Sequence, residues 1–139
     1  MVTTIHIEGV DRTGKDTLAA ALTKETKLKY YITARSPIST ISYAVLYNRE
    51  RISWEELEEY FSNPQIFLVY LKPNREIIDE RCKKTGHEYV HSADFESFNY
   101  AVDLVSKVTK NILIIEDLNE KPEVLAKRIA KEVQKCQRK

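Results

Sequence analysis

The glycines at positions 9 and 14 constrain the fold of this chain more than any other residues. They are the two glycines of the phosphate-binding pattern G-x-x-x-x-G-K, which occurs here in the segment Gly9-Val10-Asp11-Arg12-Thr13-Gly14-Lys15-Asp16-Thr17. Such glycines let the backbone curl tightly, so that successive N–H groups point at a polyphosphate while the lysine reaches its β- and γ-phosphates. An alternating apolar stretch precedes the segment and a helical pattern follows it, which is the context that the motif requires. The sequence therefore predicts a nucleotide site at residues 9–17.

The residue after the lysine departs from this pattern. Position 16 holds an aspartate where a serine or threonine is usual, whose hydroxyl binds Mg²⁺. A carboxylate is also a good Mg²⁺ ligand, so we expect Asp16 to bind the metal, with the Thr17 hydroxyl beside it. Where no metal intervenes, the Asp16 charge repels the phosphates and weakens binding.

Apolar periodicity along the chain predicts strands that alternate with helices. Strands are expected at residues 3–8, 29–34, 65–71 and 112–115. The continuous apolar run of 65–71 is typical of a strand covered on both faces, and 112–115 is expected to be buried. Helices are expected after Gly14, after Pro37, after a capping box at Ser53 and Glu56, over 73–84, around 95–105, and at the C-terminal end. This alternation predicts an α/β, P-loop NTPase-type layered fold, with an approximately four-stranded parallel sheet flanked by helices.

The composition fits a single domain over residues 1–139, because no Pro/Gly-rich linker or repeat divides the chain. With 22 Lys and Arg against 21 Asp and Glu, the charge argues against a long nucleic-acid partner. No apolar run approaches the ~20 residues of a membrane span. The N-terminus lacks a signal-peptide pattern, and Cys82 and Cys136 have no metal-ligand spacing, so we expect free thiols and a cytoplasmic location.

Three segments, in the same order along the chain, resemble the thymidylate kinase family. Residues 7–15 look like its (F/I)-E-G-x-D-(R/G)-x-G-K loop, residues 34–40 resemble its Asp-Arg-Ser segment, and residues 80–90 resemble the lid of compact phage-encoded members. The resemblance implies transfer of the γ-phosphoryl group of ATP, with Mg²⁺, to a deoxynucleoside monophosphate such as dTMP or a related pyrimidine nucleotide. It also implies the host cytoplasm if the source is viral, and it allows a homodimer.

The resemblance assigns roles to single residues by position. Lys15 would bind the β- and γ-phosphates of ATP, Asp11 the sugar hydroxyl of the acceptor, and Arg12 would bring the two phosphates together. Arg35 would hold the acceptor phosphate, whereas Arg81 and Lys84 would close over the transferring group. Lys15, Arg12, Asp11 and Arg81 form the expected catalytic set, because cations neutralise the charge on the transferring phosphoryl group. The expected ATP-binding residues are Gly9, Val10, Asp11, Arg12, Thr13, Gly14, Lys15, Asp16, Thr17 and Lys84.

Several alternatives to these roles stay open. Tyr43 and Tyr47 are candidates for stacking on the acceptor base, or for packing under the lid. An alternative for Arg35 is a solvated surface arginine, and for Arg81 and Lys84 the solvated face of a helix. His6 is expected to be structural, and Lys15 to be exposed in its loop. The segment 116–119, where the resemblance places a loop over adenine, reads by itself as an acidic turn and a helix cap.

Two departures from the family favour other functions. Ala34 stands where the family has an acid before the arginine, and the link between the first helix and Arg35 leaves almost no room for substrate-covering helices. Together with Asp16, they favour a nucleotide-binding regulatory protein that has lost turnover. A kinase that acts on a modified base or a polynucleotide end is a second alternative.

Overall fold

The computed structural model describes residues 1–10, 13–40, 53–72, 74–86 and 92–137. Its elements, in chain order, are β1 (Thr4–Glu8), α1 (Lys15–Glu25), β2 (Tyr31–Thr33), α3 (Trp54–Phe61), β3 (Ile66–Leu71), α4 (Arg75–Thr85), α5 (Ser92–Ser106), β4 (Ile112–Ile115) and α6 (Pro122–Gln137). Residues 37–40 are also helical, as the fixed φ of Pro37 favours. The expected continuation of that helix through Ile41 and Val45 lies outside the described residues.

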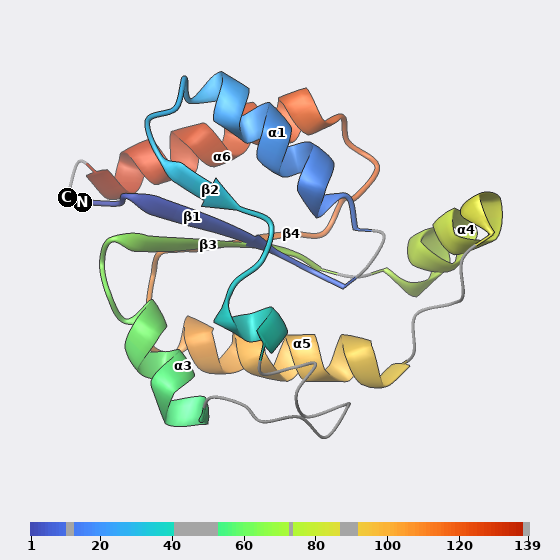
Figure 1. Cartoon of the computed structure of the whole chain (residues 1–139), viewed down its shortest axis with the longest axis horizontal. Helices are drawn as coiled ribbons and strands as arrows, with labels where there is room; N and C mark the ends of the chain where they lie inside the picture. The colour runs from blue at the N-terminus through green and yellow to red at the C-terminus, as the bar shows by residue number, and fades with distance from the viewer. Residues whose placement is uncertain (11–12, 41–52, 73, 87–91, 138–139) are drawn as a thin grey trace.

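The strands form a parallel sheet in the order β2-β1-β3-β4. Because all strands run in the same direction, their carboxyl ends lie together at one end of the sheet, on the right in Figure 1. The chain enters β1 at the opposite end of the sheet, where the backbone N–H of Val2 donates to Gln137 Oε1 at 3.0 Å, so that the start of the chain meets the end of α6. This confirms the predicted α/β class with a four-stranded parallel sheet.

Burial differs along the sheet. Every residue of β3 is buried, as its continuous apolar sequence predicts for a strand covered on both faces. β4 departs from the prediction, since it lies at the edge of the sheet and only Ile115 of this strand is buried. Ile114 is 41% exposed, because an edge position has a neighbouring strand on one side alone.

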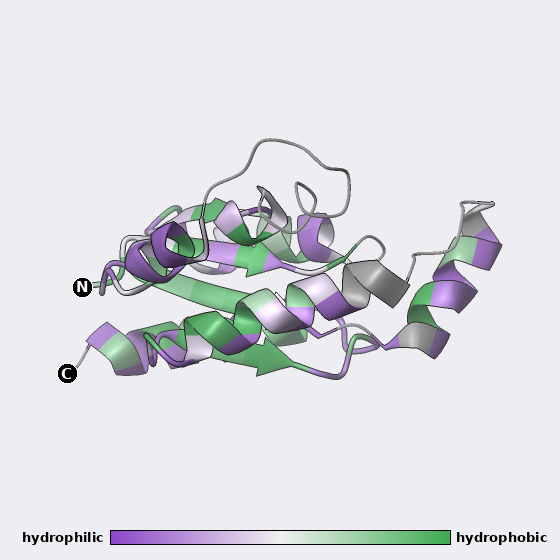
Figure 2. Ribbon diagram, turned by 90° about the horizontal axis from the view of Figure 1, so that it is seen from below, coloured by the Kyte–Doolittle hydropathy of each residue, from purple (hydrophilic) through white to green (hydrophobic). Residues whose placement is uncertain are grey.

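Helices cover both faces of the sheet. In Figure 1, α1 and α6 pack together above the sheet while α3 and α5 pack together below it. Figure 2, seen from below, shows that the strands behind these lower helices are mainly hydrophobic. Below the sheet, the Trp54 ring meets the edge of the Tyr100 ring at 4.9 Å between centroids. α4 stands apart, beyond the carboxyl ends of the strands.

Side chains and glycine terminate the helices as the sequence suggests. The Ser53 hydroxyl accepts a hydrogen bond from the backbone N–H of Glu56, so the predicted N-cap of α3 is confirmed. Gly86 ends α4 with φ +71°, a left-handed conformation that glycine adopts without strain. Cys82 and Cys136 form no disulfide bond with each other. Within the described ranges, no helix has the length and apolar character to cross a membrane.

Candidate functional site

The loop after β1 lies close against the end of β3, which explains its first glycine. A Cβ on Gly9 would lie 2.7 Å from Thr13 Oγ1 and 3.0 Å from the carbonyl oxygen of Leu71. The first separation is too short for a real Cβ, so the Thr13 side chain would have to shift, and the second is a tight contact with the backbone of β3. The Thr13 hydroxyl also donates to the carbonyl of Val10 at 2.8 Å, and this bond ties the loop to itself.

The second glycine makes the turn into α1. Gly14 has φ +90° and is the N-cap of α1, which begins at Lys15. The first N–H groups of any helix have no partner within the helix and carry the positive end of its dipole, so this terminus suits an anion. Asp16 and Thr17 lie exposed in this first turn.

Lys15 is buried, with 7% of its surface exposed, so the expectation of an exposed loop lysine was wrong. Its ammonium group donates to the carbonyl oxygen of Gly9 at 3.2 Å. The Glu8 carboxylate is near enough for the Lys15 charge to lower the pKa of Glu8. The aliphatic stem of Lys15 is thus removed from water while its ammonium group has the Gly9 carbonyl oxygen as a partner.

A cavity of about 420 Å³ adjoins the loop on the side of α1 and α6. Thr13, Gly14 and Thr17 form one wall, and the segment 118–122 between β4 and α6 forms another. Leucines line much of the remainder, and an apolar pocket with a few polar groups beside an anion site suits a nucleotide base. Segment 118–122 therefore lines a cavity, a role that it has in addition to the turn that the sequence suggested.

Arg81 connects α4 to this cavity. Its Nη2 donates to the carbonyl oxygen of Leu118 at 2.7 Å, and its Nη1 lies 3.8 Å from where a Cβ on Gly14 would be. The structure therefore brings Arg81 beside the loop, although 67 positions separate it from Gly14 in the sequence. Lys84 is not brought there: its ammonium group pairs with Glu80 at 3.3 Å, and its side chain is 72% exposed.

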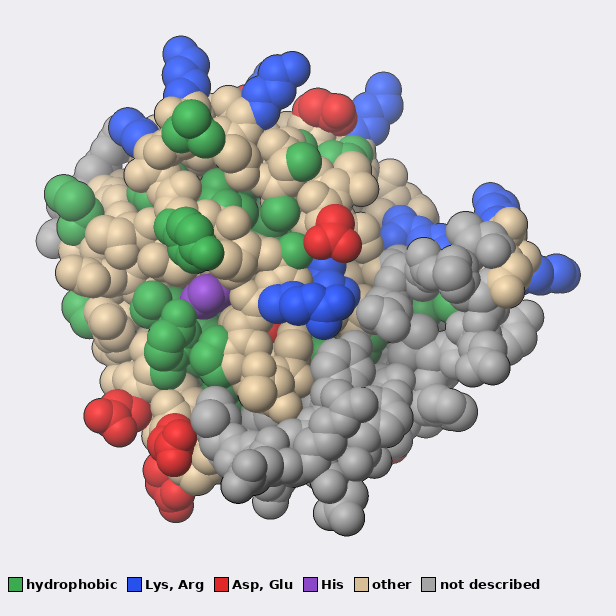
Figure 3. Space-filling view, in the orientation of Figure 1, with side chains coloured by type: hydrophobic (Ala, Val, Ile, Leu, Met, Phe, Trp, Pro, Cys, Tyr) green, Lys and Arg blue, Asp and Glu red, His purple; other side chains and the backbone are tan. Residues whose placement is uncertain are grey.

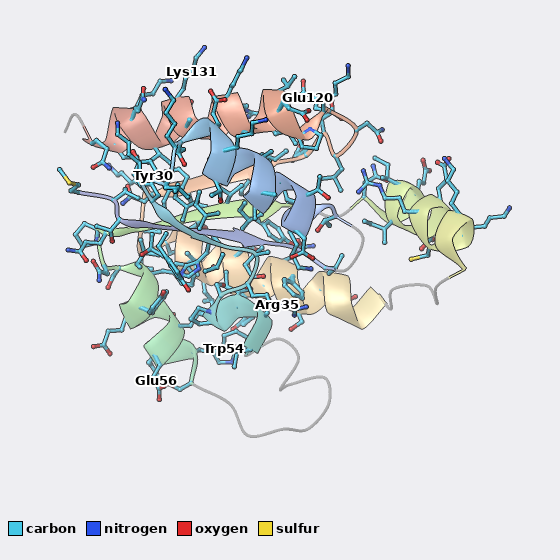
Figure 4. All side chains as sticks on the ribbon, turned by 45° about the horizontal axis from the view of Figure 1, so that its top comes forward. Tyr30, Arg35, Trp54, Glu56, Glu120 and Lys131 are labelled. Carbon is cyan, nitrogen blue, oxygen red and sulfur yellow. The ribbon has the colours of Figure 1, made fainter. Side chains whose placement is uncertain are left out.

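Arg35 is exposed and follows the carboxyl end of β2, next to β1 in the sheet. Figure 4 shows it on the side of the sheet where α3 and α5 lie. Its carbonyl oxygen accepts from the Thr33 hydroxyl at 2.6 Å and lies 3.1 Å from His6 Nδ1. In the space-filling view, a patch of Lys and Arg colour lies near the centre of the face shown, with an acidic side chain directly beside it (Figure 3).

Glu8 is a functional candidate that the sequence reasoning missed. Its carboxylate is completely buried, and it accepts from the Ser36 hydroxyl at 2.5 Å and from the backbone N–H of Ser39 at 2.9 Å. The Ser39 hydroxyl lies 2.5 Å from Oε1 and 2.7 Å from Oε2. Burial raises the pKa of the Glu8 carboxyl, although these bonds and the Lys15 charge act in the opposite direction. The available signal in the sequence was the charged residue that ends the first strand, directly before Gly9.

His6 joins the same region from the same face of β1, two residues before Glu8. Its Nδ1 lies 2.6 Å from the Thr33 hydroxyl, and its Nε2 lies 2.6 Å from the Tyr60 hydroxyl. Burial lowers the pKa of His6, because removal from water disfavours the charged imidazolium. The neutral ring with a proton on Nδ1 satisfies the carbonyl of Arg35 and accepts from Tyr60. His6 thus has the structural role expected from the sequence.

The predicted residues Asp11, Arg12, Tyr43 and Tyr47 lie outside the described residues. Among the residues that the structure describes, no three His, Cys, Asp or Glu side chains are grouped to hold a metal ion. Asp16 is therefore a single carboxylate in the first turn of α1, beside Thr17. A lone carboxylate is compatible with Mg²⁺ when substrate phosphates and water supply the other ligands.

A comparison with solved structures supports the fold. The chain is similar to the YorR protein from Bacillus subtilis, whose crystal structure is a complex with phosphorylated GDP. The TM-score is 0.73 at 22% sequence identity, and the match covers 95% of this chain and 96% of the other. No protein-family model matches the chain, and no curated protein sequence matches it.

Proposed function

We propose that this protein is a nucleotide kinase that transfers the γ-phosphoryl group of ATP to a deoxynucleoside monophosphate, dTMP or a related pyrimidine nucleotide. The observation that carries the proposal is the buried Lys15, held by the carbonyl of Gly9 in a loop that opens on the 420 Å³ cavity. A lysine in that position exchanges one oxygen partner for another when a triphosphate enters.

The donor nucleotide fits one side of the sheet. Its base occupies the cavity, and its phosphates lie on the loop and on the N-terminus of α1. Arg81, already beside Gly14, adds a positive charge where the γ-phosphate would lie. Asp16 and the Thr17 hydroxyl would hold Mg²⁺, which when bound neutralises phosphate charge. The occupation of a similar fold by phosphorylated GDP in YorR supports nucleotide binding.

The acceptor nucleotide fits the end of the neighbouring strand. Arg35 follows β2 at the edge of the sheet where the strands end, which is where open α/β sheets bind ligands. A guanidinium grips a phosphate with two parallel hydrogen bonds, so Arg35 would orient the acceptor phosphate toward the loop. The resemblance adds Asp11 and Arg12 to this phosphate contact and Tyr43 and Tyr47 to the base.

A nucleotide-binding regulatory protein without turnover is the second candidate. It is favoured by Ala34, which directly precedes Arg35 and supplies no acid to this end of the sheet. Asp16, in the first turn of α1, then supplies an exposed carboxylate beside the loop. The two functions differ in whether a monophosphate binds and is converted. A kinase that acts on a modified base or on a polynucleotide end would also leave dTMP unphosphorylated.

A panel of nucleoside monophosphates tests the proposal. We expect ADP to form from ATP and Mg²⁺ with dTMP or another pyrimidine deoxynucleotide, and not with GMP or AMP. Arg35→Ala should weaken monophosphate binding by roughly ten- to a hundredfold, because it removes a charge-assisted bidentate pair of hydrogen bonds. The same change should alter ATP affinity by less than about twofold. Arg128→Ala, an exposed arginine of α6, is the matched control and should change neither.

Two outcomes would count against this assignment. If ATP binds but no monophosphate does at millimolar concentration, the regulatory function is correct. If Arg35→Ala binds monophosphate as the wild type does, Arg35 is not the acceptor residue. Guanine nucleotides belong in the panel because YorR holds phosphorylated GDP.

A further inference from the structure

Glu8 stands between the two halves of the proposed site. It is the last residue of β1 and directly precedes Gly9, the first residue of the phosphate loop. Its partners Ser36 and Ser39 belong to the segment that directly follows Arg35, although they lie 28 and 31 positions away along the chain. One carboxylate thus connects the start of the donor loop to the segment that carries the acceptor arginine.

The contacts of Glu8 hold this segment in one conformation. The Ser36 hydroxyl donates to Glu8 and at the same time accepts from the N–H of Ile38, so it caps the helical turn at residues 37–40. The backbone N–H of Ser39 also donates to Glu8, which fixes the main chain and not only the side chains. Because the turn is capped and anchored, the backbone at Arg35 has little freedom to move.

The surroundings of Glu8 exclude a direct role in chemistry. The residue is 0% exposed, and both carboxylate oxygens are occupied by donors. On the side of β3, the Tyr70 hydroxyl donates to Asn99 at 2.7 Å, and the nearby Glu8 charge helps to raise the pKa of Tyr70. A carboxylate enclosed by β3 and by residues 36–39 cannot reach a bound nucleotide without losing its hydrogen bonds.

We propose that Glu8 is a positioning residue that sets the separation between the donor loop and Arg35, and so aligns two nucleotides for transfer. This inference rests on the proposed function, because it gives Arg35 the acceptor phosphate. Glu8 acts through Ser36 and Ser39 on the backbone that carries Arg35, and touches neither nucleotide. Alignment of this kind matters because phosphoryl transfer depends mostly on positioning.

Ser39→Ala is the main test, since it removes one hydroxyl and changes the volume little. We expect the affinity for dTMP to fall roughly tenfold, as for the loss of a buried hydrogen bond to a charged group, with ATP affinity unchanged. Ser106→Ala is the matched control, because that exposed hydroxyl donates to a carbonyl of its own helix. Glu8→Gln should show the same selective loss if it folds, and Ser39→Ala suffices if it does not.

A double-mutant cycle separates positioning from a general structural role. In Arg35→Ala/Ser39→Ala we expect dTMP affinity no lower than in Arg35→Ala alone, because Ser39 acts through Arg35. Additive losses, or equal dTMP affinities in Ser39→Ala and Ser106→Ala, overturn the inference. A kinetic readout follows the same logic, with a raised KM for dTMP and an unchanged KM for ATP.

Amide hydrogen exchange tells failure of this inference apart from failure of the proposed function. A wild-type protein that binds no monophosphate contradicts the proposed function and the role of Arg35. The anchoring is then still measurable, since Ser39→Ala should speed exchange of the backbone amides of residues 38–40 but not of α1. Unchanged exchange at these amides overturns the anchoring itself.

Discussion

Lys15 shows how one residue serves both binding and stability. The spacing of the motif placed it correctly after Gly14, but its burial follows from the way the loop folds back on Gly9. Two consequences follow from the same position. The ammonium group is available to a phosphate, and until a phosphate arrives it satisfies a carbonyl and lies near the buried Glu8 charge.

Lys15→Ala should therefore abolish measurable ATP binding and also lower the free energy of unfolding, by about 1–3 kcal/mol, because the Gly9 carbonyl loses its charged donor. Lys24→Ala is the matched control, since Lys24 is exposed in the last turn of the same helix. It should change the free energy of unfolding by less than about 0.5 kcal/mol and leave ATP affinity intact. Calorimetric titration and urea unfolding measure both quantities. Unchanged ATP affinity in Lys15→Ala would remove the loop from the site.

At the scale of elements, polar contacts between strand ends and helices hold the site together. His6 connects three elements, because its ring lies in β1, contacts Thr33 of β2 and meets Tyr60 of α3. The link from α1 to β2 is also tightly shaped, with left-handed backbone at Lys27 (φ 52°) and Leu28 (φ 64°). Neither residue is one that the sequence marks as a turn former, so this turn depends on the elements that flank it.

The lowered pKa of His6 predicts how stability depends on pH. In the unfolded chain His6 takes up a proton near pH 6.5, whereas the buried ring resists protonation until a lower pH. The stabilisation by His6 is therefore fully present above pH 6.5 and is lost as the pH falls through the folded pKa. We expect the wild type to exceed His6→Gln in free energy of unfolding by more at pH 7.5 than at pH 5.5. Both proteins keep Glu8, His87 and His91, so the titration of these groups cancels in the difference.

Urea unfolding at the two pH values measures this difference. Tyr60→Phe is the control, because it removes the hydroxyl that meets Nε2 but keeps the titrating ring. It should retain most of the pH dependence of the wild type. A wild-type advantage over His6→Gln that is equal at both pH values would mean that burial does not keep His6 neutral.

At the scale of the whole molecule, the helical layers make the two proposed sites distinct. The cavity lies on the side of α1 and α6, whereas Arg35 lies on the side of α3 and α5 (Figures 1 and 4). The sheet between them is almost entirely buried at β1 and β3. Ile129 of α6 does not line the cavity, so it tests whether this layer can lose stability without losing ATP binding.

Ile129→Ala tests this separation. Ile129 is completely buried in α6, so its truncation should cost about 2–5 kcal/mol of unfolding free energy through lost burial and the cavity left behind. Val124→Ala, at a position of the same helix that is 49% exposed, should cost less than about 1 kcal/mol. ATP affinity of the folded protein should match the wild type in both variants. A large loss of ATP affinity in Ile129→Ala would show that the layer and the cavity respond together.

Local spacing alone determined the strands, the helices, the loop at residues 9–17 and the cap at Ser53. These features depend on neighbours a few positions apart, whose geometry is the same in any fold. Tertiary structure decided the burial of Lys15, the exposure of β4, the approach of Arg81 to Gly14 and the contacts of Glu8 with Ser36 and Ser39. Such contacts arise only when the order of strands brings distant segments to one edge of the sheet, and spacing along the chain carries no record of that order.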